Sequence, residues 1–147
     1  SDHRHFVVPV PDSDDYITRL FVSPYQCDLV FTIEYDNGED GGGHVIRLLP
    51  DSAMQRWHAK WFGFNVAEPL VRPPYLYVAA IGTIGKIDMR TGQYVWRRDD
   101  LYERKSGAYG SFEQPELLAD TLLFPSTASG VPRRLLVSDS SGLVLSR

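Results

Sequence analysis

Two stretches of the sequence contain residue types found in metal sites. Residues 1–3 place His3 third from the first amine, and an amine, two amides and an imidazole form a square-planar site suited to Cu(II) or Ni(II). Residues 36–41 superficially resemble a calcium loop, but Gly38 stands at the third ligand position and Arg47 where a bidentate glutamate belongs. A frayed terminus and a solvated hairpin loop explain the two stretches better. We therefore expect no metal and no cofactor.

Nucleophilic catalysis would need a serine or a cysteine beside a base. Ser138, Ser140 and Ser141 flank Asp139, but the sequence has no Gly-x-Ser-x-Gly elbow, and turn chemistry explains the run. Cys27 comes just before a predicted strand, and we expect it to be a small buried hydrophobic residue. On these grounds no enzyme is expected.

Carboxylates leave one enzymatic hypothesis open. Asp36, Glu39 and Asp40 are close together in the sequence and could serve a hydrolase or a sugar-processing enzyme. Such enzymes need an acid and a base placed across a defined cleft, and no pattern in the sequence pairs them in this way. We therefore rank this hypothesis below a binding function.

Composition limits the class of partner. The chain has 147 residues with a net charge of −4 and a pI near 5.5, which argues against nucleic acid or an anionic membrane surface. This acidity favours a basic protein partner, or none. No uncharged stretch is long enough to span a bilayer, and one cysteine excludes an intramolecular disulfide. The chain begins at Ser1 without a signal peptide, as a mature product would, and we expect a soluble, periplasmic or secreted protein.

The elements that must position any site are strands and glycine turns. Residues 75–79 are typical of a strand, and residues 85–88 begin another. Thr91 and Gly92 predict a turn, since glycine supplies the positive φ that a tight turn needs. Residues 93–96 then alternate polar and apolar side chains, the period of a half-buried strand.

The same order of elements occurs three times. Residues 28–57 give strand, loop, strand, turn and a strand ending in Trp57; a short helix at residues 54–61 is a minority alternative. Residues 114–124 align with residues 68–78 at an offset of 46, and residues 29–31 lie 47 before residues 76–78. The third copy continues to Leu145 without a tryptophan. Two offsets that agree within one residue indicate a repeat architecture.

The central copy has the spacing Asp-x-x-Thr-Gly-x-x-x-Trp at Asp88, Thr91, Gly92 and Trp96. This pattern resembles the PQQ-like repeat of quinoprotein-type β-propellers. The resemblance implies that each copy is one four-stranded blade and that the tryptophan wedges between neighbouring blades. Quinone binding needs a complete ring with residues converging on its centre, so we do not carry that cofactor over.

We therefore expect an all-β fold of three antiparallel sheet repeats of about 46 residues, a partial or assembled β-propeller. An open β-sandwich is the alternative. Three blades are too few for a ring of about four to eight, so the chain is either a fragment or one half of a homodimer, unless an N-terminal strand at residues 6–10 covers an edge. The expected divisions of the single domain 1–147 are 1–21 for the N-terminal strand and edge, then repeats 22–68, 69–114 and 115–147.

Binding is expected on one rim of the stack. Equivalent loops of stacked repeats lie on the same rim, which makes neighbours of residues 58–67 and 97–113. Aromatic residues with arginine are typical interface anchors, and large aromatics that fold back into the core are the alternative. The predicted partner-binding residues are Trp61, Phe64, Tyr102, Arg104 and Tyr109.

The first functional hypothesis is a non-enzymatic module that binds a protein through this rim. The second is a small inhibitor, such as an immunity protein that neutralises a bacterial toxin, which the modest size and acidity of the chain suit. The sequence does not name the partner.

Overall fold

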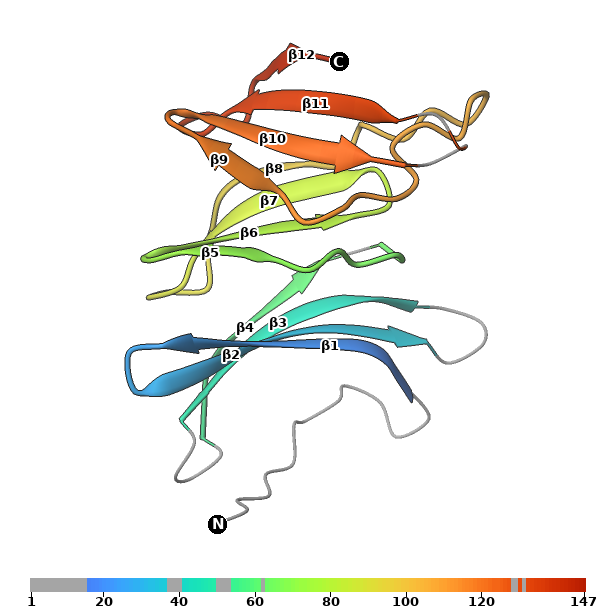
Figure 1. The fold of residues 1–147 in the computed structure, drawn as a ribbon. Helices are drawn as coiled ribbons and strands as arrows, with labels where there is room; N and C mark the ends of the chain where they lie inside the picture. Colours follow the sequence, from blue (N-terminus) through green and yellow to red (C-terminus); the bar gives the residue numbers. More distant parts are fainter. Residues whose placement is uncertain (1–15, 37–40, 50–53, 62, 128–129, 131) are drawn as a thin grey trace.

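The structure, a computed structural model, describes residues 16–36, 41–49, 54–61, 63–127, 130 and 132–147. Twelve strands and no α-helix are found in these ranges, and they form three stacked four-stranded antiparallel sheets (Figure 1). The prediction of an all-β fold is confirmed, and the alternative of a helix at Met54–Trp61 is wrong. The predicted strand at residues 6–10 and the possible amine site at residues 1–3 lie outside the described residues.

Each sheet is a simple meander in which neighbours in sequence are neighbours in space. None of the three is closed into a barrel. The first sheet contains β1 (Tyr16–Tyr25), β2 (Asp28–Asp36), β3 (Gly41–Leu49) and β4 (Met54–Trp61). The second contains β5 (Leu70–Arg72), β6 (Tyr75–Ala80), β7 (Thr83–Asp88) and β8 (Tyr94–Arg98), and the third contains β9 (Glu116–Leu118), β10 (Thr121–Ser126), β11 (Arg133–Ser138) and β12 (Val144–Ser146).

The second sheet is buried on both faces because it lies between the other two. Successive side chains of a strand point to opposite faces. Leu76 and Val78 accordingly join a core with Val30 of the first sheet, whereas Tyr77 and Ala79 join a core that reaches the third sheet. This double burial explains why residues 76–80 form an uninterrupted apolar run.

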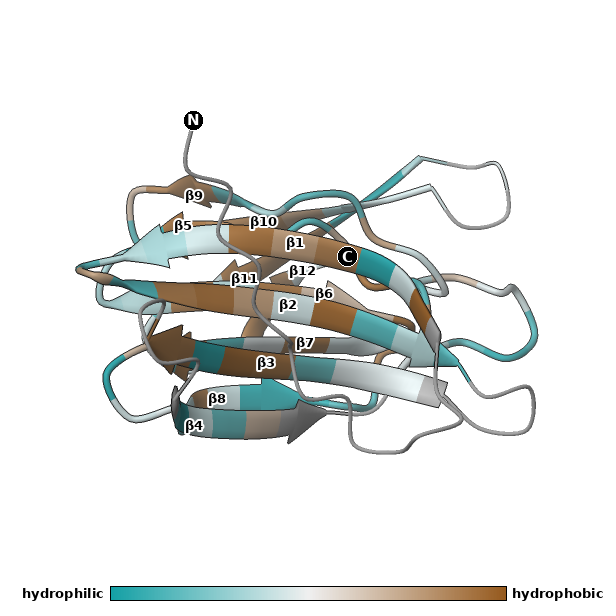
Figure 2. Ribbon diagram, turned by 90° about the horizontal axis from the view of Figure 1, so that it is seen from below, coloured by the Kyte–Doolittle hydropathy of each residue, from teal (hydrophilic) through white to brown (hydrophobic). Residues whose placement is uncertain are grey.

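The outer face of the first sheet carries apolar side chains. On this sheet, Phe31, Ile33, Ile46 and Leu48 form a separate buried cluster, and apolar colour runs along β1, β2 and β3 in Figure 2.

The division of the chain at residues 22, 69 and 115 remains a prediction, although β1 crosses the first of these boundaries. No described element is a helix of the length and apolarity that a membrane crossing requires.

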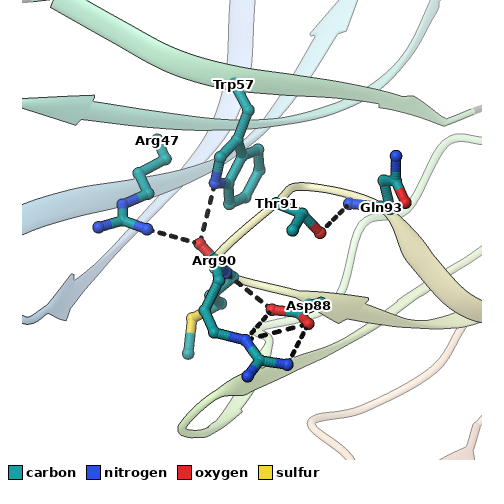
Figure 3. A network of polar contacts seen from close by, with 7 residues as sticks. Arg47, Trp57, Asp88, Arg90, Thr91 and Gln93 are labelled. Carbon is teal, nitrogen blue, oxygen red and sulfur yellow. Dashed lines mark hydrogen bonds and ion pairs between the residues drawn. The ribbon is translucent and has the colours of Figure 1, made fainter.

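A tryptophan joins the first sheet to the second. The Trp57 indole Nε1 donates to the Met89 carbonyl at 2.9 Å, in the turn between β7 and β8 (Figure 3). A Cβ at Gly92, whose φ is 74°, would lie 2.5 Å from the Trp57 ring. Only glycine allows this backbone conformation and this closeness together. The indole therefore packs flat against the next sheet's turn.

An equivalent contact joins the second sheet to the third. Trp96 Nε1 donates to the Asp139 carbonyl at 2.7 Å, and a Cβ at Gly142 would lie 2.8 Å from its ring. The turns match, because Gly142 N–H donates to the Ser138 carbonyl as Gly92 N–H donates to that of Asp88. Both tryptophans thus contact the next sheet as the repeat predicts, and we call these contacts the first and second junctions.

Candidate binding surface

The two segments that follow the tryptophans meet at one turn of the second sheet. The Ile81 amide donates to the Phe64 carbonyl at 2.8 Å, and the Gly82 amide donates to the Tyr109 carbonyl at 2.7 Å. Asn65 Nδ2 also donates directly from one segment to the other, to the Gly110 carbonyl at 3.2 Å. We call this surface, made of residues 63–67, 81–82 and 99–112, the loop rim.

The longer segment is held rigidly although it has little regular structure. A bridge between Glu103 and Ala108 closes a small hairpin, and the Gly107 amide donates back to the Glu103 carbonyl at 2.8 Å. Four apolar side chains of the segment enter the core between the second and third sheets: Leu101, Ala108, Tyr109 and Phe112. Loops anchored in this way present their exposed residues in a fixed arrangement.

The shorter segment is fixed from the first sheet. Glu34, which is 8% exposed, accepts from the Val66 amide at 2.5 Å and from the Thr18 hydroxyl at 2.8 Å. Arg19 Nη1 donates to the Val66 carbonyl at 2.9 Å. Sequence reasoning missed Thr18, Arg19 and Glu34, because their partners lie far along the chain and no local pattern marks them.

The structure separates the predicted anchors into two groups. Phe64 is 43% exposed and Tyr102 is 45% exposed, and Arg104 is also exposed on the hairpin turn. Trp61 ends β4, and its side chain lies outside the described part of the structure. Tyr109 is only 1% exposed, so it is a core residue and not a surface anchor.

Backbone geometry explains why Tyr109 turns inward. Its φ of 58° is in the left-handed region, which a bulky residue rarely adopts, and its carbonyl accepts from Gly82. The ring stacks on Phe112 with centroids 5.9 Å apart. Packing and this hydrogen bond together hold the strained conformation.

Two ion pairs lie where β8 meets the loop rim. Arg98 Nη2 donates to Asp100 at 2.7 Å, and this hydrogen bond lowers the pKa of the Asp100 carboxyl. Arg97 pairs with Asp99 in the same way, at 2.7 Å. Each aspartate thus has its charge matched by an arginine of β8.

A second group of charges surrounds a cavity at the edge of the third sheet. The cavity has a volume of about 450 Å³ and is lined by Tyr109, Pro132, Arg133, Arg134, Leu136, Ser146 and Arg147. Glu103 of the loop rim hairpin reaches its border, where its carboxylate lies 3.3 Å from Arg147 and 3.9 Å from Arg133. The cavity therefore adjoins the loop rim.

Other chemical candidates do not form a catalytic arrangement among the described residues. His44 and His58 are in hydrogen-bond contact, with ring centroids 4.6 Å apart, but no group of three or more metal-binding side chains is found in that part of the chain. Ser138 contacts Ser140 at 3.1 Å, as expected of a turn. Cys27 is exposed in the turn between β1 and β2, so the expectation that it is buried is wrong.

No protein-family model matches the sequence, and no curated protein matches it either. Among solved structures, a europium-containing methanol dehydrogenase matches with a TM-score of 0.57 and 13% identity. The match covers 91% of this chain, which spans only 27% of the length of that enzyme. The chain has a propeller-like fold. At this identity the likeness shows the fold alone. The loop rim lies on the segments that connect the sheets of this stack.

Proposed function

We propose that this chain is a non-enzymatic protein-binding module that acts through the loop rim. The observation that carries the proposal is the exposure of Phe64 and Tyr102 on segments tied to each other and to the second sheet by hydrogen bonds. Interfaces are enriched in aromatic residues and arginine, and rigid anchors lose little conformational entropy on binding.

The clusters of polar side chains support the non-enzymatic part of the proposal. Among the described residues, the polar clusters are ion pairs, turn contacts and the histidine pair, and none combines a nucleophile with an oriented base. The alternative hydrolase would use Asp36, Glu39 and Asp40, but the last two residues lie outside the described ranges. The methanol dehydrogenase likeness adds no catalytic residue, because it concerns the fold.

A small inhibitor of a bacterial toxin is a narrower form of the same proposal, since it also binds one protein. A periplasmic or secreted location and a homodimer remain predictions. Identification of the bound protein would distinguish a toxin from any other partner.

The test compares capture by the parent chain with capture by a variant carrying Phe64→Ala, Tyr102→Ala and Arg104→Ala. We expect the variant to keep its free energy of unfolding within about 1 kcal/mol, because the three side chains are surface-exposed. It should bind the captured protein at least about 2 kcal/mol more weakly, as loss of interface anchors does.

Leu143→Ala with Gln93→Ala provides the matched control. Both residues are exposed, and they lie in the turns that receive the two tryptophans, away from the loop rim. Mass spectrometry would identify the captured protein and titration calorimetry would measure its affinity. Equal loss of affinity in the control, or none in the loop rim variant, would exclude the loop rim as the binding surface.

A further inference from the structure

Positive charge gathers beside the loop rim although the whole chain is acidic. The net charge is −4, yet five cationic side chains lie around the hairpin and the adjoining cavity. Glu103 is the one carboxylate that pairs with any of them among the described residues. We call this group the basic corner: Arg104, Lys105, Arg133, Arg134 and Arg147.

One carboxylate cannot neutralise this group. Glu103 divides its two oxygens between Arg147 at 3.3 Å and Arg133 at 3.9 Å. Within the described residues, no acidic side chain lies within ion-pair distance of Arg134, which is exposed. Arg104 and Lys105 are likewise exposed at the tip of the hairpin. The corner therefore has an excess of positive charge that an anionic partner would neutralise.

The cavity also has an apolar part. Leu136 and Pro132 line it beside the three arginines. An extended segment in which acidic and apolar side chains alternate matches this lining, because successive side chains of an extended chain point to opposite sides.

We propose that the basic corner binds an extended acidic segment of a protein partner, with carboxylates directed at Arg134 and Arg147. This proposal rests on the proposed function and specifies the chemistry of its partner. Guanidinium groups bind carboxylates through two parallel hydrogen bonds, which favours arginine over lysine at such sites. The local charge thus favours an acidic partner, whereas the net charge of the chain favours a basic one.

The test uses a fluorescein-labelled peptide of about eight residues in which aspartate alternates with valine, the period of a strand. Fluorescence anisotropy should show saturable binding that weakens as the salt rises from about 50 to 300 mM, because added ions screen exposed charges. A peptide with asparagine in place of aspartate should bind about tenfold more weakly or worse. A phosphoserine peptide of the same length tests the other source of negative charge.

Two charge-reversal variants and one control locate the site. Arg134→Glu and Arg104→Glu should each weaken binding of the aspartate peptide by about tenfold or more, because each replaces attraction with repulsion. Arg72→Glu, at an exposed arginine at the end of β5, should change it less than about twofold. Thermal unfolding of all three variants checks that they remain folded.

Four outcomes would overturn the proposal: no saturable binding, equal binding of the asparagine peptide, preference for the phosphoserine peptide, or equal loss in the Arg72→Glu control. Self-association that Arg134→Glu abolishes would make a second copy of the chain the occupant instead. If the aspartate peptide does not bind while the loop rim variant still binds its captured protein more weakly than the parent chain, the proposal of an acidic partner is wrong and the proposed function is retained. If the peptide binds but the parent chain captures no protein, the proposed function is wrong and the acidic site is retained.

Discussion

The two junctions share one design but distribute their charges differently. At each junction a tryptophan and a cation from the same sheet contact one carbonyl of the next sheet's turn. In the first junction, Arg47 donates to the Met89 carbonyl at 2.9 Å while its guanidinium pairs with Asp28 of its own sheet at 2.6 Å. The ion pair of the first junction therefore lies within one sheet.

The ion pair of the second junction crosses between sheets. Lys86, which is 4% exposed, pairs with the Asp139 carboxylate of the third sheet at 2.8 Å, and the Tyr77 hydroxyl donates to the same oxygen at 2.8 Å. The Lys86 ammonium also lies 4.1 Å from the centre of the Tyr75 ring. The same backbone contact is therefore present at both junctions, whereas the ion pair lies within one sheet at the first junction and between two sheets at the second.

Substitution of the two tryptophans should give the largest losses of stability. Trp96 is buried at 8% exposure, so Trp96→Ala should cost about 3–5 kcal/mol of the free energy of unfolding. Trp57 is only half-buried, so Trp57→Ala should cost less, about 2–3 kcal/mol. Urea unfolding followed by circular dichroism measures both values. A larger loss for Trp57→Ala would reverse the ranking of the two junctions.

Substitution of the cations at the two junctions should give the next largest losses of stability. Lys86→Met leaves the Asp139 carboxylate without its ammonium partner and should cost about 3 kcal/mol. Arg47→Met should cost less, about 2 kcal/mol, because Asp28 keeps Arg56 at 3.8 Å. The same unfolding experiment at neutral pH provides the comparison. An equal or smaller loss for Lys86→Met would mean that the ion pair between the sheets adds nothing to the second junction.

Alkaline pH should test both junctions through their tyrosines. Burial, helped by the hydrogen bond to Asp139, raises the pKa of Tyr77 well above the usual phenol value. Burial also raises the pKa of Tyr94, near the first junction, to about 12. Above pH about 10, the unfolded chain loses these protons while the folded chain keeps them, so the free energy of unfolding falls as the pH rises.

Removal of one phenol should reduce this pH dependence. Tyr77→Phe should lose less stability than the parent between pH 9 and about 11.5, and Tyr94→Phe should do so to a smaller extent, because its shift is smaller. Urea unfolding at several pH values measures the slopes. Parallel slopes for the parent and Tyr77→Phe would contradict the assignment of this proton to the second junction.

Much of the fold could be predicted from local patterns. The turn at Gly92 and the strand ending in Trp96 follow from glycine chemistry and alternation, and the offset of 46 residues located the third sheet without a tryptophan. Contacts between sheets could not be predicted in this way. Asp139 appeared only as a turn residue, and Arg47 only as a residue unsuited to a calcium loop, because their partners lie in other strands.

The candidate site could be predicted only in outline. Equivalence of the loops correctly placed the two segments side by side, as the contact between Asn65 and Gly110 shows. The pattern did not distinguish buried Tyr109 from exposed Tyr102, since both are tyrosines of one irregular segment. The net charge did not reveal the basic corner either, because it does not say where in the fold the charged residues lie.

Hydrogen exchange of the indole N–H groups, followed by nuclear magnetic resonance, tests the central claim about the two junctions most directly. Each of Trp57 and Trp96 donates its indole proton to a carbonyl of the next sheet. We expect both protons to exchange much more slowly than a free indole, and that of Trp96 to be the slower, because it is better buried. Exchange of both protons at the rate of a free indole would show that the tryptophans do not join the sheets.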